Sequence, residues 1–333
     1  MSKTEQNNTQ PLGLDIGTSR IVLARSNDRK YEYQTQLNAF VVLPNSKLVA
    51  TLLTQENVFH EVHGQEIVVA GNDAEKFAEV LHVETRRPML DGVLNPNEPH
   101  SLAVMRRIIT KVAGRAASEG QKLYYSIPAS SGNATGIAYH SASCRQILTE
   151  LGYDATPIEE GLAVVIGELG SSNYTGIGIS CGSGMCNVCL AVLSIPVVSF
   201  SVPKAGDFID SQTALVTGER ATRVRVQKET DFHLNGFTAD RVQNAFTIHY
   251  QEMVHNLVDA MCANISSNKR LPKLDQPIPL VLSGGTAMPK GFRDLFEKTL
   301  SASDFPVRLS GIQVSSDPLL STARGAMMAA LCS

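Results

Sequence analysis

Apolar and polar residues follow one another along the chain in a pattern that predicts short strands and amphipathic helices in turn. Residues 12–25 form two apolar runs separated by a turn, and a single acid, Asp15, lies inside the first run. Residues 174–193 repeat this arrangement of strand, glycine-rich turn and strand in the second half of the chain. Strands that alternate with helices, twice over, indicate an α/β protein with two similar halves.

Further elements are predicted in both halves. Apolar residues at helical spacing, with a glycine such as Gly152 just beyond the last turn, indicate helices. Short apolar runs between turn signals such as Pro44 and Asn45 indicate strands. We expect strands within 39–53, 66–71, 122–128 and 278–285, and helices over 73–81, 101–120, 140–152, 161–170, 207–216, 218–228, 238–266, 291–300 and 317–332.

Composition narrows the class of protein. The 333 residues, of which 43% are hydrophobic and 18% charged, are enough for two domains with sizeable cores. A formal net charge of -3 gives no global attraction to nucleic acid or to an anionic membrane. No apolar run approaches the roughly 18 residues of a membrane span. The polar residues 1–11 lack the apolar core of a signal peptide and the periodic face of an amphipathic anchor. We therefore expect a flexible tail there, no membrane contact through it, and a cytoplasmic protein.

The cysteines point to the same compartment. All six are sparse and stand in apolar contexts, which suits a reducing cytosol better than a disulfide framework. Cys181, Cys186 and Cys189 are close in sequence, but no second cysteine or histidine pair follows at the spacing of a metal site. We interpret these three as small buried residues.

Three glycine-rich turns carry the candidate chemistry. Glycine lets backbone N–H groups approach phosphate oxygens without obstruction by a Cβ atom, and the hydroxyls of Thr18, Ser19 and Ser183 add donors. Asp15 would repel phosphate directly, but it suits a site in which Mg²⁺ with its water shell lies between the two. In the third turn, Gly284 and Gly285 allow close packing against a ring or a sugar. The three turns together predict a nucleotide site between two hairpins.

These motifs resemble the ATPase superfamily of actin, the sugar kinases and the heat-shock chaperones, and within it the bacterial actin MreB. "GLDIGTSRIVLA" resembles the first phosphate motif, "GISCGSGMCNVCLAV" lies where the second belongs, and "VLSGGTAMPKGF" matches the adenosine motif. "PIEEGLAVVIG" and "DPLLSTARGA" resemble the two connecting helices, and "RRPMLDGVL" favours MreB over the kinases. The resemblance spans roughly residues 12–331 in the correct order.

The resemblance implies an actin-like fold with two similar lobes, each a mixed sheet flanked by helices, and a nucleotide cleft between them. Lobe I would comprise residues 12–165 and 317–333, with an outer subdomain at about 40–85. Lobe II would comprise residues 166–316. Its outer subdomain, at about 208–255, would be reduced because few residues precede the long helix at 238.

The resemblance also implies the ligand, which is ATP or ADP with Mg²⁺. Asp15 would hold the metal, through water, and act in catalysis. The residues that match the nucleotide-binding motifs are Gly17, Thr18, Ser19, Arg20, Gly182, Ser183, Gly184, Gly206, Asp207, Glu219, Arg223, Gly284, Gly285, Thr286 and Met288.

The chain departs from the family pattern at positions that matter for catalysis. Ser180 stands where the second phosphate motif carries an aspartate, so weaker metal binding and slow hydrolysis are expected. No acid stands where MreB has the glutamate that positions the attacking water. His140 falls nearest, either as a group that orients water or as a partly exposed residue at a helix start. Glu160, in the first connecting helix, is another catalytic candidate.

A further departure concerns the helix on the adenosine side. MreB usually has Glu and Lys three residues apart after a "GERT" motif, where this chain has Arg223 and Val226. Arg225 and Lys228 take these places if the register slips by two residues.

Three functions are compatible with these features. The first is an MreB-related ATP-binding protein of the bacterial cytoplasm, with slow ATPase activity and nucleotide-dependent self-assembly into filaments. The second is a non-polymerising nucleotide-binding scaffold or regulator that reports its nucleotide state to a protein partner. The third, a small-molecule kinase, needs a carboxylate base near the γ-phosphate, and the expected segment contains none. The predicted partners are further copies of the chain or another protein, without nucleic acid.

Overall fold

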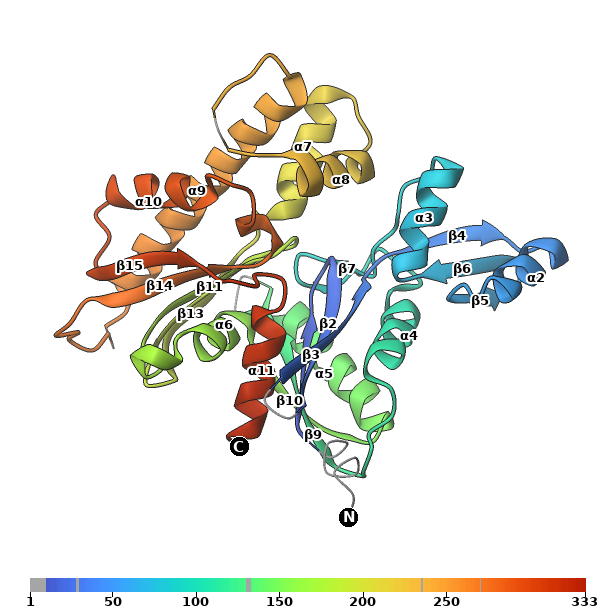
Figure 1. Ribbon diagram of the computed structural model, residues 1–333, viewed down its shortest axis with the longest axis horizontal. Helices are drawn as coiled ribbons and strands as arrows, with labels where there is room; N and C mark the ends of the chain where they lie inside the picture. Colours follow the sequence, from blue (N-terminus) through green and yellow to red (C-terminus); the bar gives the residue numbers. More distant parts are fainter. Residues whose placement is uncertain (1–9, 28–29, 130–132, 235, 270) are drawn as a thin grey trace.

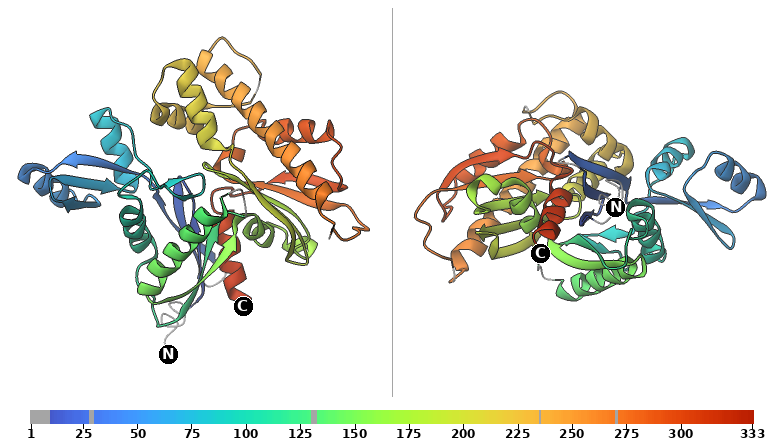
Figure 2. Two further views of the ribbon diagram at one scale, coloured as in Figure 1. Left: turned by 180° about the vertical axis from the view of Figure 1, so that it is seen from behind. Right: turned by 60° about the horizontal axis from the view of Figure 1, so that its bottom comes forward.

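The structure is a computed structural model that describes residues 10–27, 30–129, 133–234, 236–269 and 271–333. Two five-stranded sheets form two lobes, and helices α6 (Glu160–Glu168) and α11 (Ser321–Leu331) lie between them (Figures 1 and 2). Residues 1–9 of the tail expected over 1–11 lie outside the described residues. No helix among the described residues combines the length and the apolar character that a membrane-spanning segment needs.

The sheet of lobe I begins with the hairpin that contains Asp15. Its strands lie in the order β10-β9-β1-β2-β3, with β1–β2 and β2–β3 antiparallel and β1–β9 and β9–β10 parallel. Apolar residues from this sheet pack against the helices of the lobe in one core. The elements are β1 (Leu12–Ile16), β2 (Arg20–Asn27), β3 (Lys30–Leu37), α4 (Ser101–Ala113), β9 (Gln121–Ile127), α5 (Ala134–Glu150) and β10 (Tyr153–Glu159).

The sheet of lobe II has the same connectivity. Its order is β13-β12-β11-β14-β15, again with an antiparallel meander of three strands followed by two parallel strands. The predicted similarity of the two halves is therefore present in the topology. The elements are η1 (Gly170–Ser172), β11 (Gly176–Cys181), β12 (Cys186–Val192), β13 (Ile195–Val202), α9 (Arg241–Ser267), β14 (Ile278–Ser283), η2 (Gly285–Ala287), α10 (Phe292–Ser301) and β15 (Leu309–Val314).

Each lobe carries an outer part beyond its sheet. In lobe I this part is a three-stranded sheet with two helices, joined to the body by the short hairpin β7–β8. In lobe II it consists of α7, α8 and the start of α9, and the described residues there contain no strand. The elements are β4 (Phe40–Pro44), α2 (Lys47–Gln55), β5 (His60–His63), β6 (Glu66–Ala70), α3 (Asn72–Leu81), β7 (Met89–Leu90), β8 (Val93–Leu94), α7 (Gly206–Thr217) and α8 (Ala221–Asp231).

Helices α6 and α11 cross at small residues, which brings the two lobes close together. A Cβ atom on Gly325 would lie 1.8 Å from the carbonyl oxygen of Ala163, so no larger residue fits at this crossing. Because α6 contacts strands of both sheets, it belongs to neither lobe alone. The boundaries 12–165 plus 317–333 for lobe I and 166–316 for lobe II stay a proposal.

Several predicted elements differ from the structure in their bounds, and the helix expected over 140–152 begins earlier, at Ala134. Strands were expected throughout 39–53, but α2 begins at Lys47, because the Ser46 side chain caps it by accepting a hydrogen bond from Val49 N at 3.2 Å. The helix expected over 101–120 ends at Ala113, where Gly114 adopts a positive φ of 68°. In addition, strands β3, β5, β7, β8, β10, β13 and β15 were not predicted from the sequence.

Candidate functional site

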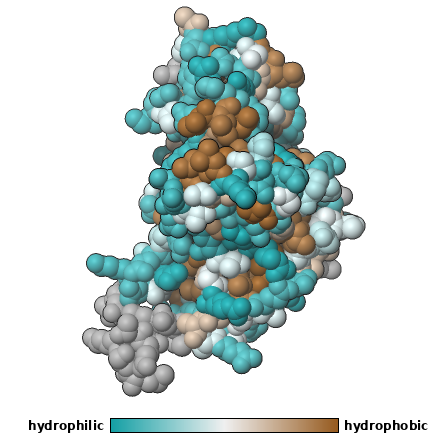
Figure 3. Space-filling view, turned by 90° about the vertical axis from the view of Figure 1, so that its right-hand side faces the viewer, coloured by the Kyte–Doolittle hydropathy of each residue, from teal (hydrophilic) through white to brown (hydrophobic). Residues whose placement is uncertain are grey.

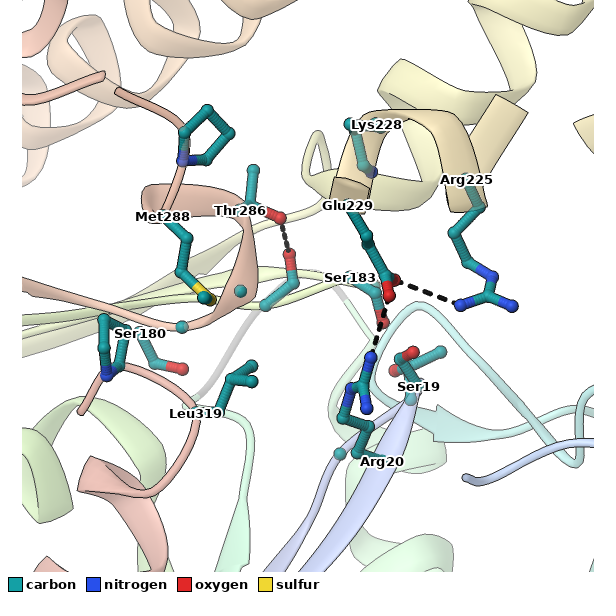
Figure 4. A pocket seen from close by; sticks show the side chains of 18 of the residues that line it. Ser19, Arg20, Ser180, Ser183, Arg225, Lys228, Glu229, Thr286, Met288 and Leu319 are labelled. Atoms are coloured by element: carbon teal, nitrogen blue, oxygen red, sulfur yellow. Dashed lines mark hydrogen bonds and ion pairs between the residues drawn. The ribbon is translucent and has the colours of Figure 1, made fainter. Parts of the chain in front are cut away.

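A cavity of about 420 Å³ lies between the lobes, at the ends of β1, β11 and β14. A volume of this size is typical of a small-molecule site. We call it the interlobe cavity. Most of the residues predicted for the site line it, and they come from both lobes (Figure 4). They are Asp15, Gly17, Thr18, Ser19, Arg20, Glu160, Gly182, Ser183, Gly184, Gly284, Gly285, Thr286 and Met288.

The first two glycine-rich turns meet across this cavity. Gly17 N donates to the carbonyl oxygen of Arg20 at 2.9 Å and closes the turn of lobe I. Gly182 N donates to Met185 O at 3.0 Å and closes the turn of lobe II. A Cβ atom on Gly184 would lie 2.5 Å from Thr18 Oγ1, so the two turns are in contact. Two hairpin tips thus approach one space from opposite lobes.

The third turn packs directly behind the second. Gly284 has a φ of 88°, and a Cβ atom there would lie 2.2 Å from Cys181 O, so this position requires glycine. Thr286 Oγ1 donates to Gly182 O at 2.7 Å, which ties the third turn to the second. Met288 is 51% exposed and offers an apolar surface at the edge of the cavity.

Two carboxyl groups, Asp15 and Glu160, line the cavity beside the turns. Ser126 Oγ donates to Asp15 Oδ1 at 2.7 Å, and Ser180 Oγ donates to Glu160 Oε2 at 2.9 Å. Burial raises the pKa of Asp15 to about 6. Burial, followed by the nearby charge of Asp15, raises the pKa of Glu160 to about 8. The serine at position 180 therefore serves as a hydrogen-bond donor to Glu160.

The donor set suits a hydrated magnesium ion. Asp15 and Glu160 offer carboxylate oxygens, which are the ligands that Mg²⁺ prefers. Among the described residues, no three His, Cys, Asp or Glu side chains gather closely enough to hold a metal ion by themselves. Water and phosphate oxygens would therefore complete the coordination, as Mg²⁺ usually requires.

Gly206 and Asp207 lie behind the second turn and do not line the cavity. Gly206 N donates to Gly182 O at 3.2 Å and Asp207 N donates to Ser183 O at 2.7 Å. The Asp207 carboxylate pairs with Arg87 Nη1 of lobe I at 2.6 Å. These residues therefore support the turn and join the lobes. They were predicted to contact the nucleotide, but they do not line the cavity.

His140 lies outside the cavity and cannot orient a water molecule there. Its side chain is fully buried in α5, where its Nε2 lies 3.7 Å from Cys144 Sγ, and it does not line the cavity. Burial lowers the pKa of His140 to about 4. Both alternatives considered from the sequence fail, because α5 begins at Ala134 and places His140 one and a half turns inside the helix, on its apolar face. His140 is therefore not carried into the proposed site.

Helix α8 faces the cavity with other residues than those predicted from the sequence motif. Arg223 pairs with Glu219 at 3.0 Å, and its side chain is 74% exposed, so neither residue lines the cavity. Arg225 and Lys228, the alternatives two residues further on, do line it. The structure therefore brings to the cavity the two residues that a register slip of two would place there, and their role in nucleotide binding stays a proposal.

Several lining residues were not predicted, and Asp210, the partner of Lys228, is one of them. Lys228 Nζ lies 2.8 Å from Asp210 Oδ1, and both side chains are at least nine-tenths buried. Glu229, on the next position of α8, pairs with Arg20 and Arg225 (Figure 4). Asp210 is the buried acid, and the sequence signal for it is its spacing of three residues from Asp207, which places both on one side of a helix. The remaining lining residues that were missed include Phe232, Tyr250 and Leu319.

Known structures share this architecture over almost the whole chain. A MamK double helical filament is 18% identical, with 96% of this chain and 98% of that chain covered and a TM-score of 0.72. MreB5 of Spiroplasma citri bound to AMPPNP is 13% identical, with 95% and 94% covered and a TM-score of 0.68. The ethanolamine utilization protein EutJ from Carboxydothermus hydrogenoformans is 18% identical, with 95% and 88% covered and a TM-score of 0.54. The likeness shows that this chain has the actin-like fold.

Sequence comparison gives a family but no characterised relative. No curated protein matches the chain. The family model described as Volactin matches residues 11–330, which is nearly the full length. The chain therefore belongs to the Volactin family.

Proposed function

We propose that this chain is an MreB-related, actin-like protein that binds ATP or ADP with Mg²⁺ between its lobes and assembles into filaments according to the bound nucleotide. One observation carries the proposal: the turns at Gly17 and Gly182, from different lobes, line the same cavity. Backbone N–H groups at such turns suit phosphate oxygens. A ligand held from both sides would also fix the lobes relative to each other.

The chemistry at this site would consist mainly of positioning and charge neutralisation. Mg²⁺, when bound near Asp15, would supply positive charge to the phosphates. Glu160 is the remaining acid beside the turns, and one of its oxygens already accepts a hydrogen bond from Ser180. An acid engaged in this way is a poor base for an attacking water, which supports slow hydrolysis.

Self-assembly is supported by the fold and by the surface. The similar MamK structure is described as a double helical filament. The side of the molecule with the outer part of lobe I is mostly hydrophilic but shows apolar patches (Figure 3). Leu48 and Val80 of that part are 71% and 75% exposed, and Leu215 on the outer part of lobe II is 76% exposed. Contiguous apolar patches such as those in Figure 3 are typical of protein contacts, whereas single exposed apolar residues are common on any surface.

Sedimentation and phosphate release, measured together with ATP, with ADP and without nucleotide, test the proposal. We expect more protein in the pellet with ATP and a phosphate-release rate far below that of a metabolic kinase. Binding of ATP with no pellet under any condition would favour the scaffold or regulator. An argument for it is that the described residues in the outer part of lobe II contain no strand. Phosphate transfer that depends on an added small hydroxyl compound would favour the kinase.

A further inference from the structure

Arg20 is the cation of the first turn, and it reaches across the cavity. Its backbone closes that turn by accepting the hydrogen bond from Gly17, so the side chain leaves from a fixed point at the start of β2. Arg20 Nη2 lies 2.8 Å from Glu229 Oε2 on α8. In Figure 4 the Arg20 side chain points past Ser19 towards Glu229, with Ser183 close by. A single ion pair therefore joins the phosphate turn of lobe I to a helix of lobe II.

Glu229 has a second cation, which makes Arg20 the exchangeable member of the cluster. Arg225 Nη1 lies 3.1 Å from Glu229 Oε1, and Arg225 also pairs with Glu75 on α3. Arg225 is 7% exposed in its side chain, whereas Arg20 is 31% exposed. An exposed pair is weak, and Glu229 keeps a partner if Arg20 leaves. Arg20 can therefore turn to another anion without stranding a buried charge.

A polyphosphate at the turns is the anion that fits. Of the other cations that line the cavity, Arg225 is held by Glu75 and Glu229, and Lys228 is held by Asp210 at 2.8 Å and by Gly206 O at 3.1 Å. The carboxylate of Asp15 repels phosphate, so a cation at the turn is needed beside any metal. A guanidinium stays charged at all relevant pH values and can hold two phosphate oxygens at once.

We infer that Arg20 exchanges Glu229 for the terminal phosphates of the nucleotide, and that it selects tri- and diphosphates over monophosphates. The inference rests on the proposed function, because it assigns a role within the same site. The exchange removes one ion pair between the lobes when the phosphates are bound. Phosphate length is thereby coupled to the contacts of α8 with lobe I.

The test is calorimetric titration of the full chain with ATP, ADP and AMP at constant Mg²⁺. Arg20→Gln is expected to weaken ATP binding by about ten- to a hundredfold, because a charge-assisted contact is lost, and to change AMP binding by less than about threefold. The ATP affinity of Arg20→Lys is expected to lie between that of the wild type and that of Arg20→Gln. Glu229→Gln is expected to tighten ATP binding, because a carboxylate that competes with the phosphates for Arg20 is removed. Arg293→Gln, which breaks an exposed pair with Glu297 at 3.5 Å on α10, is the matched control.

The possible failures are distinct. If the wild type binds none of the three nucleotides, the proposed function itself is wrong. If the wild type binds ATP and Arg20→Gln binds it equally well, Arg20 stays with Glu229 and the inference is overturned. If Arg20→Gln lost affinity for ATP and AMP equally, the inference would also be overturned, because Arg20 would then act by positioning the lobes and not by contacting the terminal phosphates. A thermal melt of each variant identifies a folding defect, and Arg20→Lys provides the conservative comparison.

Discussion

Thr18 and Gly184 are in contact although they belong to different lobes. A Cβ atom on Gly184 would lie 2.5 Å from Thr18 Oγ1 and 2.8 Å from the backbone nitrogen of Gly92. The tips of two hairpins therefore meet at a point where no side chain fits. This contact brings both phosphate turns to the interlobe cavity, and the proposed function depends on it.

Gly184→Ala tests that contact. The added methyl group would push against Thr18 and against the backbone at Gly92, which cannot move as freely as a side chain. We expect a loss of stability of about 1–3 kcal/mol and a loss of ATP affinity of at least about tenfold. Urea denaturation and nucleotide titration measure the two effects. Gly311→Ala is the control, because nothing lies within 4 Å of a Cβ atom there. Unchanged ATP affinity in Gly184→Ala would show that the turns need not approach so closely.

Ser180→Asp tests the carboxyl groups beside the turns. The new acid would stand beside Glu160, which Ser180 now contacts at 2.9 Å, and near Asp15. We expect a lower melting temperature in EDTA, because buried like charges repel, and a larger gain on adding Mg²⁺ than the wild type shows. Ser310→Asp, at an exposed position of β15, provides the comparison. Equal Mg²⁺ responses in Ser180→Asp and the wild type would argue against a metal at this place.

His140 predicts a dependence of stability on pH that has nothing to do with the cavity. Its pKa is about 4 in the folded chain, against an ordinary value of 6.5, so the unfolded chain binds the proton more readily. This contribution to stability is present above pH 6.5 and is lost as the pH falls towards 4. Between pH 7 and pH 5 the wild type should lose about 2 kcal/mol through this residue alone.

His140→Leu should remove that loss. The free energy of unfolding, measured with urea at pH 7 and at pH 5, should differ by about 2 kcal/mol less in the variant than in the wild type. His255→Leu, which replaces a histidine at an exposed position of α9, is the comparison variant. A variant with the full acid sensitivity of the wild type would show that His140 takes up its proton without unfolding.

The Lys228–Asp210 pair predicts a large effect from a single substitution. Lys228→Met leaves the buried Asp210 carboxyl without its cation, which should cost about 3–5 kcal/mol of stability. The double variant Lys228→Met with Asp210→Asn should recover a large part of this loss, because no buried charge remains. Arg293→Met, in an exposed pair, should cost less than about 1 kcal/mol. If Lys228→Met and Arg293→Met lost the same unfolding free energy in urea denaturation, the buried pair would contribute no more to stability than an exposed one.

The turns of the site could be predicted from the sequence because they are local features. Each consists of glycines and small hydroxyl residues directly after an apolar strand, as at Gly17 and Gly182. The face of α8 could not be predicted with the same certainty, because "ATRVRVQKETD" has no apolar stripe that distinguishes the inner side. Only the packed structure shows that Arg225 and Lys228 face inwards while Arg223 faces water.

The error at His140 has a different cause, which lies in the predicted start of a helix. With the helix beginning at Ala134, His140, Cys144, Ile147 and Leu148 form one buried face at helical spacing. A helix predicted to begin at residue 140 places His140 at its end, where the same spacing does not indicate burial. Strands such as β15 were missed for another reason: "LSGIQV" is an edge strand with mostly exposed or half-exposed residues, so its apolar pattern is weak.

Hydrogen–deuterium exchange of the full chain, with and without ATP and Mg²⁺, tests most directly whether a nucleotide lies between the two hairpins. The account predicts slower amide exchange in peptides that cover residues 13–24 and, at the same time, in peptides that cover residues 176–188, with little change in α5. Protection of only one of these turns, or of neither while ATP is bound, would contradict it.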